Sequence, residues 1–345
     1  MPESFEPSRF PPDPLLYRFE MPLKGLYYPF GFPVEITTNS ADVLKAAERH
    51  WGAFQQMFPE RPVEVRIGVL ETGAEIELVE PVLRSQGHLL IKVGTTDDFA
   101  VCDMKQGFAF AWVSAATARN HAYIHTHYIE GTAFWVLHTA YLTPIHAACV
   151  AFNGQGLLFC GESEAGKSSL AYACARKGWT FVTDDLSELV RGWETTSVLG
   201  NPYRFRLRES AVGLFPELRE HPITLRANGD RAIELFTARD STFVTAPCSR
   251  VDYVLFLRRQ SSGPPRLAPF PKEKAMRWFE QVLCFGDQNV REAQAASFRR
   301  LLAAEILEFR YSDLDSAVDE LKVLVGAVEH PARVQGFSMG YRENG

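Results

Sequence analysis

The chain has 345 residues, 46% hydrophobic and 23% charged, values typical of a globular protein with room for two domains. Its formal net charge is −6 and it has no long run of Lys or Arg, so we expect no nucleic-acid partner and no membrane partner. Its six cysteines stand singly, without a CxxC pair, which argues against a disulfide framework and against a cysteine zinc site.

The N-terminal sequence MPESFEPSRFPPDP has neither a positively charged start nor an apolar signal region. No apolar run reaches the roughly 18 residues that a membrane-spanning helix needs. We therefore expect a cytoplasmic protein, and the sequence leaves open whether it forms a homo-oligomer.

The first 140 residues predict an α+β domain of unknown role, which begins with an irregular arm of about 15 residues. Apolar residues spaced three and four apart predict a helix over 41–58, with Asn39 or Ser40 as its cap. Short β-rich runs between 63 and 114 predict an antiparallel sheet. The apolar stretch 129–142 predicts a buried helix that ends before Pro144.

Residues 141–330 predict a second domain of the α/β class, followed by a tail over 331–345. HAACVAF and LLFCG, joined by an Asn-Gly turn, predict a β-hairpin. SELV, TTSVLG and VDYVLFL are typical of strands, and EILEFRYSD followed by LDSAVDELKVLV predicts a final strand and helix. KEKAMRWFEQVLCF and EAQAASFRRLLAAE have helical patterns.

The stretch GESEAGKSS satisfies the phosphate-loop pattern G-x-x-x-x-G-K-[ST], and it lies between an apolar strand and a helical segment. Glycines let the backbone N–H groups point at phosphate oxygens, next to the positive end of the following helix. A lysine adds a charge for the β- and γ-phosphates, and a serine hydroxyl suits Mg²⁺. The predicted nucleotide-binding residues are Gly161, Glu162, Ser163, Glu164, Ala165, Gly166, Lys167, Ser168 and Ser169.

Two adjacent carboxylates, Asp184 and Asp185, follow the short strand TFVT. A helix closed by Gly178 and a return strand bring this strand end beside the loop. One aspartate there is enough for an ATPase, whereas two allow one to hold a metal and the other to accept a proton from an attacking hydroxyl. Alternatively, the pair forms a turn or helix cap, an interpretation that the nearby loop makes less favoured.

The order of hairpin, GKS loop, helix, glycine, short strand and Asp-Asp resembles the catalytic domain of HPr kinase/phosphorylase, and more closely the HPr-kinase-related proteins that share its core. The similarity covers about residues 140 to 215. It implies a nucleotide-binding core of the type found in HPr kinase and phosphoenolpyruvate carboxykinase. It also implies ATP and Mg²⁺ as cofactors and transfer of the γ-phosphoryl group to a serine hydroxyl.

The resemblance also implies a role for individual residues. Lys167 would bind phosphate, and Ser168 and Asp185 would hold Mg²⁺. Asp184 would be the catalytic base, and His146 matches a histidine on the strand that precedes the loop.

Two departures separate this chain from HPr kinase itself. The family usually has glycine where Glu164 stands in the loop. The family's later Leu-Glu-Ile-Arg-Gly-Leu-Gly type run is absent, and its nearest counterpart is FRLRESAVGLF, which contains Glu209. We therefore predict a kinase without phosphorylase activity, acting on a protein, peptide or small molecule with a free hydroxyl. The alternative is a nucleotide-binding regulatory protein with little phosphotransfer.

Three further patterns in the sequence are weaker indications of function. Arg204, Arg206 and Arg208 alternate in YRFRLR, so a strand would align three guanidinium groups on one face, either to clamp phosphate or as a solvated surface. The histidines of HAYIHTH have no cysteine or carboxylate set around them, which favours a structural role over a metal site. Arg258 and Arg259 follow a strand, where basic residues are common, and we do not include them in the site.

Overall fold

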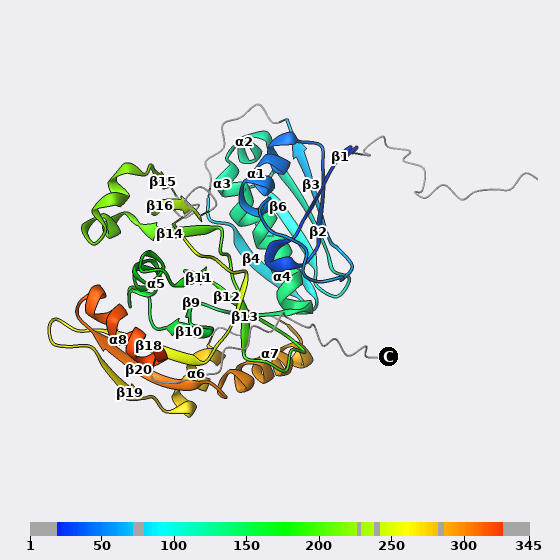
Figure 1. Cartoon of the computed structure of the whole chain (residues 1–345). Coiled ribbons are helices and arrows are strands. Elements are labelled where there is room, and N and C mark those ends of the chain that lie inside the picture. The colour runs from blue at the N-terminus through cyan, green and yellow to red at the C-terminus, as the bar shows by residue number, and fades with distance from the viewer. Residues whose placement is uncertain (1–18, 72–78, 226–228, 238–241, 282–285, 327–345) are drawn as a thin grey trace, which may run out of the picture.

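The computed structural model of the chain describes residues 19–71, 79–225, 229–237, 242–281 and 286–326. The predicted N-terminal arm and the predicted tail lie outside these ranges. The fold is mixed α/β, with several sheets and helices on their faces (Figure 1).

The N-terminal part, residues 19–140, holds one seven-stranded sheet of order β1-β2-β3-β7-β6-β5-β4. Its elements are β1 (Leu23–Tyr27), β2 (Val34–Thr38), α1 (Ala41–Trp51), β3 (Val63–Leu70), β4 (Val82–Gln86), β5 (Leu89–Val93), β6 (Phe99–Asp103), β7 (Phe108–Ser114), α2 (Ala115–Arg119), α3 (His121–Ile124) and α4 (Gly131–Ala140).

This sheet is mixed, so the prediction of an antiparallel sheet is wrong at its centre. Strands β4 to β7 pair antiparallel as predicted, but β3 runs parallel to both β2 and β7. Helix α1 lies between β2 and β3 and returns the chain to the end of the sheet where β2 begins. Neighbouring parallel strands need such a crossover connection, so β3 can run parallel to β2.

Two predicted helix boundaries are also wrong. Helix α1 is capped by the Ser40 hydroxyl, which accepts from the backbone N–H of Asp42 at 3.3 Å, but it ends at Trp51 rather than at residue 58. Gly52 follows the helix. The Phe54 side chain, beyond the helix end, is buried in the same hydrophobic cluster as Trp51.

The predicted helix over 129–142 is divided in the structure. Residues 125–130 form a π-helical turn, α4 covers only Gly131–Ala140, and Leu142 begins strand β8 (Leu142–Ile145). Strand β8 includes Pro144, which the sequence pattern treats as a helix terminator rather than as part of a strand.

The C-terminal part contains three smaller sheets and the helices that cover them. Its further elements are β9 (Ala148–Phe152), β10 (Gln155–Cys160), α5 (Lys167–Arg176), β11 (Thr180–Thr183), β12 (Ser187–Val190), β13 (Ser197–Leu199), β14 (Arg204–Arg208), β15 (Ile223–Leu225), β16 (Arg231–Phe236), β17 (Cys248–Arg250), β18 (Tyr253–Arg259), β19 (Arg266–Pro269), α6 (Lys272–Glu280), α7 (Gln288–Leu301), β20 (Glu305–Tyr311) and α8 (Leu314–Gly326).

The hairpin β9–β10 forms as predicted, with Asn153 at φ 49° and Gly154 at φ 76° in its turn. It belongs to a six-stranded sheet of order β11-β9-β10-β18-β20-β19. Helix α6 ends at Glu280, with Gln281 in a turn, and is therefore shorter than predicted; the predicted residues 282–285 lie outside the described ranges. Helix α7 begins earlier than predicted, at Gln288, because the Asp287 carboxylate accepts from the backbone N–H of Val290 at 3.0 Å.

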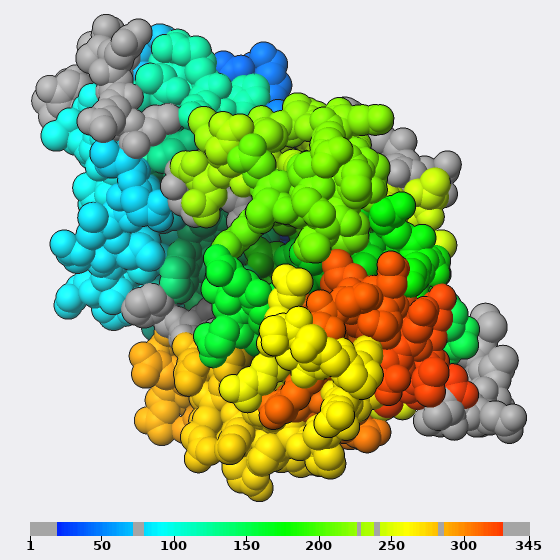
Figure 2. Space-filling view, turned by 90° about the vertical axis from the view of Figure 1, so that its left-hand side faces the viewer, coloured from blue at the N-terminus to red at the C-terminus, as the bar shows by residue number. Residues whose placement is uncertain are grey.

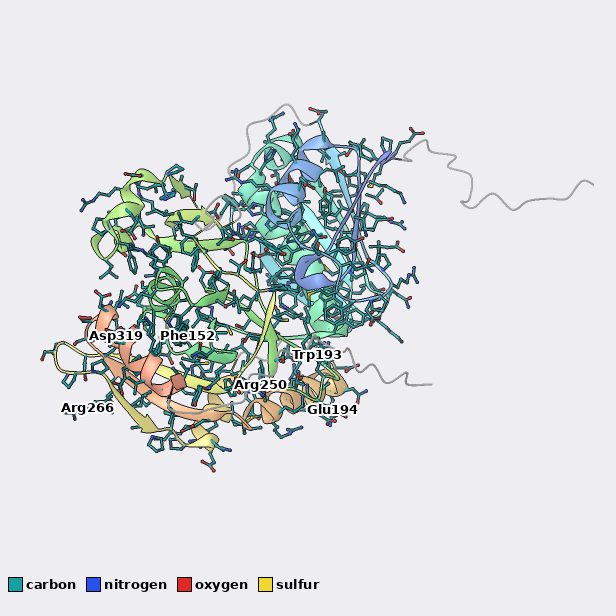
Figure 3. All side chains as sticks on the ribbon, viewed as in Figure 1. Phe152, Trp193, Glu194, Arg250, Arg266 and Asp319 are labelled. Carbon is teal, nitrogen blue, oxygen red and sulfur yellow. The ribbon has the colours of Figure 1, made fainter. Side chains whose placement is uncertain are left out.

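The N-terminal and C-terminal parts lie against each other, and polar and aromatic contacts join them. His138 Nε2 lies 2.8 Å from Oε1 of the fully buried Glu188, and Arg191 Nη2 donates to the backbone oxygen of His138 at 2.7 Å. Trp193, labelled in Figure 3, packs on Phe58 with ring centroids 5.8 Å apart. The domain boundary at residue 140 stays a prediction.

On one face the molecule is hollowed between the cyan residues of the N-terminal part and the green residues of the C-terminal part (Figure 2). Within the described ranges, no helix combines the length and the apolar character needed to cross a membrane.

Candidate functional site

Strand directions bring the sequence-predicted site residues to one edge of the six-stranded sheet. Strand β9 is antiparallel to both β10 and β11, so the ends of β10 and β11 and the start of β9 share an edge. The loop after Cys160, the aspartates after Thr183 and His146, two residues before β9, therefore meet there.

The loop between β10 and α5 has three residues in the left-handed region of backbone space. They are Gly161 at φ 145°, Glu164 at φ 69° and Gly166 at φ 94°. A side chain at Gly166 would overlap the Tyr311 hydroxyl, which donates to the backbone oxygen of Ala165 at 3.1 Å. Glycine at 166 is thus required both by its φ and by the approach of Tyr311.

Lys167, the first residue of α5, lies over this loop and is only 6% exposed. Its Nζ donates to the backbone oxygens of Gly161 at 2.8 Å and Glu162 at 3.0 Å. Burial lowers the pKa of the ammonium group, while the carboxylate of Asp185 acts in the opposite direction. A positive group is thus held at the N-terminal end of α5, where the helix dipole also favours anions.

The loop and the aspartate pair are in direct contact through Ser168. Its hydroxyl donates to the backbone oxygen of Asp184 at 3.0 Å. On the other side of Asp184, Oδ2 accepts from the backbone N–H of Arg206 on β14 at 2.6 Å. Asp184 is thus held between α5 and β14, and it is 5% exposed.

The two adjacent aspartates have different environments. Burial, together with the negative charge of Asp185, raises the pKa of Asp184 to about 7, although the N–H and guanidinium of Arg206 oppose the shift. The Asp185 side chain is 44% exposed, and its Oδ1 lies 3.1 Å from Nδ1 of His146. Burial lowers the pKa of His146, which the Asp185 carboxylate partly offsets.

Glu164 turns toward β14. Its carboxylate forms an ion pair with the guanidinium of Arg208, whose Nη2 also lies 3.4 Å from the Ser163 hydroxyl. The Glu164 side chain is 72% exposed. The negative charge in the loop is therefore paired with a cation rather than left beside the ammonium of Lys167.

These groups surround a cavity of about 570 Å³, which we call the phosphate cavity. It is lined by the loop, Asp185, His146 and the ends of β14 and β18. Of the alternating arginines, Arg206 and Arg208 line it, so β14 is not merely a solvated face.

Arg259 also lines the phosphate cavity, although the sequence interpretation leaves it out of the site. It ends β18, which runs parallel to β10, so both strands finish at the same edge. The sequence pattern predicts β18 as a strand but not its place beside β10, and only that pairing brings the end of β18 to the site.

The histidines of HAYIHTH do not line the phosphate cavity, and each of them contacts a different residue. His121 Nε2 lies 3.3 Å from Oδ1 of Asp42, His125 stacks on His50 with ring centroids 3.9 Å apart, and the backbone oxygen of His127 accepts from Lys92. Among the described residues, no group of three His, Cys, Asp or Glu side chains is arranged to hold a metal ion.

Known proteins were compared with the chain in three ways. No family model matches it. An HPr kinase/phosphorylase of Lachnoclostridium phytofermentans is 33% identical over 85 residues, which are 25% of this chain and 23% of that protein. The structure of the HPr(Ser) kinase/phosphatase of Coxiella burnetii covers 53% of this chain and 92% of its own, with 12% identity and a TM-score of 0.28.

The chain thus spans less than a quarter of the length of the curated relative it matches. Over that segment the chain is similar in sequence to an HPr kinase/phosphorylase, and it is not identified as HPr kinase itself.

Proposed function

We propose that the chain is a kinase that uses ATP and Mg²⁺ to phosphorylate a serine-like hydroxyl group. The observation that carries this proposal is the aspartate pair beside the loop, in which buried Asp184 has a pKa of about 7 and Asp185 is half-exposed. A nucleotide-binding loop alone serves many reactions, whereas a base poised near neutral pH beside it serves transfer to a hydroxyl.

The phosphate cavity supports the binding of an ATP triphosphate. Backbone N–H groups at the start of α5, the Lys167 ammonium and the guanidinium groups of Arg208 and Arg259 all border it. Lysine supplies a point charge and arginine a planar fork, and both suit phosphate oxygens.

The oxygen donors present fit Mg²⁺, which prefers carboxylate and hydroxyl oxygens and phosphate. The hydroxyl of Ser168 and the carboxylate of Asp185 line the same cavity as Lys167, and both would hold the ion. Bound there, Mg²⁺ neutralises negative charge on the phosphates. His146, 3.1 Å from Asp185, would orient that carboxylate.

In the proposed reaction Asp184 accepts the proton of the acceptor hydroxyl. The hydroxyl oxygen forms a bond to the γ-phosphorus, the bond from that phosphorus to the β,γ-bridging oxygen breaks, and ADP leaves. The carboxylate of Asp184 is held by the backbone N–H of Arg206, so its orientation does not depend on substrate. We propose only this forward transfer, without phosphorylase activity.

The decisive experiment replaces Asp184 by Asn. The amide keeps an oxygen that can accept from the Arg206 N–H but cannot take a proton, so we expect transfer from labelled ATP to fall by about 10²–10⁴-fold. Binding of Mg-ATP should stay nearly unchanged, since Asp184 does not line the phosphate cavity.

The matched control is Asp319→Asn on α8, labelled in Figure 3, where the side chain is 69% exposed and lines neither the phosphate cavity nor the space around Asp184. It should retain full transfer. A purified protein that binds Mg-ATP but transfers phosphate to nothing, with or without Asp184, would instead favour the nucleotide-binding regulatory protein.

A further inference from the structure

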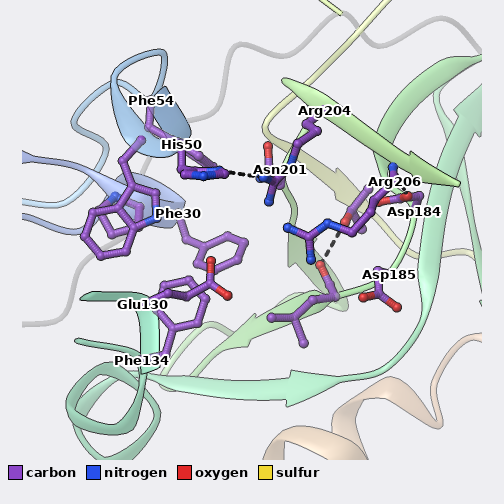
Figure 4. A pocket seen from close by; sticks show the side chains of 14 residues that line it. Phe30, His50, Phe54, Glu130, Phe134, Asp184, Asp185, Asn201, Arg204 and Arg206 are labelled. Atoms are coloured by element: carbon purple, nitrogen blue, oxygen red, sulfur yellow. Dashed lines mark hydrogen bonds between the residues drawn. The ribbon is translucent and has the colours of Figure 1, made fainter. Parts of the chain in front are cut away.

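A second cavity lies on the other side of the aspartate pair, between the N-terminal and C-terminal parts (Figure 4). It has a volume of about 90 Å³. Asp184 lines this cavity but not the phosphate cavity, whereas Asp185 and Arg206 line both. The proton-accepting carboxyl therefore faces a space distinct from the one that suits the nucleotide.

The N-terminal part supplies an aromatic wall to this cavity. Phe30 packs on Phe54 and on Phe134, with ring centroids 6.0 Å and 5.3 Å apart, and Trp51 packs on Phe134 at 6.1 Å. All four rings line the cavity. Rigid rings that exclude water around a reacting hydroxyl strengthen the electrostatic interactions there.

The C-terminal part supplies positive charge through β14. Arg204 and Arg206 both project into the cavity, and Arg204 is 8% exposed (Figure 4). Glu234 on β16 is within 3.4 Å of Arg204 Nη1 and 3.5 Å of Arg206 Nε, but it does not line the cavity. From outside the cavity Glu234 partly offsets both guanidinium charges, and the carboxyl groups of Glu130 and Asp184 also act on Arg204.

His50 holds Arg204 without adding charge. Its Nδ1 lies 2.5 Å from Arg204 Nη1, and burial together with the neighbouring arginines lowers the pKa of His50 to about 2. The imidazole is therefore neutral and accepts the N–H of Arg204. Burial also raises the pKa of Glu130, which lines the cavity opposite. The positive charge that borders the cavity thus comes from Arg204 and Arg206, and not from His50.

The volume limits what can enter. On the same measure one water molecule needs roughly 10–15 Å³, so the cavity accepts only a few non-hydrogen atoms. That size suits a compact molecule, and of a folded protein no more than a single side chain would fit.

We propose that this cavity binds the phosphoryl acceptor, and that the acceptor is a small hydroxyl-bearing molecule with a carboxylate, such as a hydroxy acid or a hydroxy amino acid. Its hydroxyl lies at Asp184, its carboxylate at Arg204 and Arg206, and its carbon atoms against the phenyl rings. The N-terminal part is then half of the acceptor site. This inference rests on the proposed kinase function and deepens it.

The first test uses the purified full chain with γ-labelled ATP, Mg²⁺ and a cell extract divided by ultrafiltration into small molecules and proteins. Serine, threonine, glycerate and lactate are assayed beside serinamide and lactamide. We expect label in the small-molecule fraction, on a compound that mass spectrometry identifies as a carboxylate. We also expect kcat/KM for a carboxylated acceptor to exceed that of its amide by about tenfold or more.

Label found only on proteins, or on small molecules that lack a carboxylate, overturns this inference and leaves the kinase function standing. Label on neither fraction, from a protein that binds Mg-ATP, removes the kinase function itself. The two failures are therefore distinguishable.

The second test separates the acceptor from the nucleotide with variants. Arg204→Lys keeps the charge but loses the planar fork, so KM for the carboxylated acceptor should rise about tenfold while KM for ATP stays unchanged. If Arg204→Lys fails to fold, Phe134→Leu takes its place: it changes the aromatic wall of the cavity but leaves its charged groups unchanged, and KM for the acceptor is measured in the same way. The control is Lys45→Ala on α1, outside the cavity and exposed. An unchanged acceptor KM in both folded variants contradicts the assignment.

Discussion

The two cavities beside the aspartate pair are built in different ways. Every residue that lines the phosphate cavity belongs to the C-terminal part, from His146 through the loop, the start of α5 and β14 to Arg259. The second cavity is assembled from both parts of the chain, around Phe30, His50 and Glu130 in the N-terminal part and around Asp184 and Arg204 in the C-terminal part.

This difference is one of chemistry as well as construction. In the proposed site, phosphate would be recognised mainly by backbone N–H groups, whose direction depends on the φ values at Gly161 and Gly166. The second cavity depends on side chains, including aromatic rings and buried guanidinium groups. Substitutions on the phosphate side should therefore change nucleotide binding, and those on the other side only the use of the acceptor.

The largest expected effect on nucleotide binding comes from a substitution in the phosphate cavity. Lys167→Ala removes the charge at the loop and should weaken Mg-ATP binding by about 10²-fold, since a hydrogen bond to a charged group contributes roughly 1.5–3 kcal/mol. Titration with a fluorescent ATP analogue measures this. Lys105→Ala in the turn between β6 and β7 is the control, because that lysine is exposed and lies outside the cavity.

Unchanged nucleotide affinity in a folded Lys167→Ala protein would reject the loop as the binding site. Circular dichroism checks folding, because Lys167 is buried and its loss removes two hydrogen bonds to loop carbonyls.

The sequence predicts that the loop and the aspartates lie side by side, because the signal is local. The strand, loop, helix and return strand follow one another within residues 155–183, and this order brings Lys167, Ser168 and Asp185 to one cavity. What the sequence did not reveal is that β18 ends at the same edge, and so Arg259 was left out.

The second cavity has no comparable local signal. His50 lies 2.5 Å from Arg204 although 154 residues separate them along the chain. An α1 that continued to residue 58, as the apolar spacing predicts, would not leave Phe54 free to pack beside Phe30 and Tyr203. Tertiary packing, rather than local propensity, decides where α1 ends.

The next largest effect is the pH dependence of kcat/KM, which tests the role of Asp184 in the second cavity. Because the base must be ionised, kcat/KM for the acceptor should fall about tenfold per pH unit below pH 7, the pKa of Asp184. Affinity for Mg-ATP should show no such step, because Asp184 does not line the phosphate cavity. A flat profile between pH 5 and 8, measured as initial rates, would exclude Asp184 as the base.

The same pKa gives a second readout in stability. The folded pKa of Asp184 lies above its ordinary value of 3.8, so folding takes up a proton and stability falls as pH rises between about 4 and 7. Asp184→Asn should remove this loss and raise the free energy of unfolding by about 1–3 kcal/mol at pH 8. Denaturant unfolding at pH 5 and pH 8 measures the difference.

The smallest effect lies in the loop itself, at the residue that departs from the family pattern. Glu164 adopts φ 69°, which costs a non-glycine residue roughly 1–2 kcal/mol, and its carboxylate occupies the guanidinium of Arg208. Glu164→Gly removes both the backbone cost and the ion pair. We expect ATP to bind a few-fold more tightly, since Arg208 then faces phosphate alone.

A double-mutant cycle decides which of the two causes is responsible. If the released Arg208 binds phosphate, the gain from Glu164→Gly should vanish in an Arg208→Gln background, because no guanidinium remains to be released. A gain of equal size in both backgrounds would instead assign it to the relaxed loop backbone. In that case Glu164 limits nucleotide binding through conformation, and Arg208 belongs with Arg204 and Arg206 as part of a charged strand rather than as a ligand of its own.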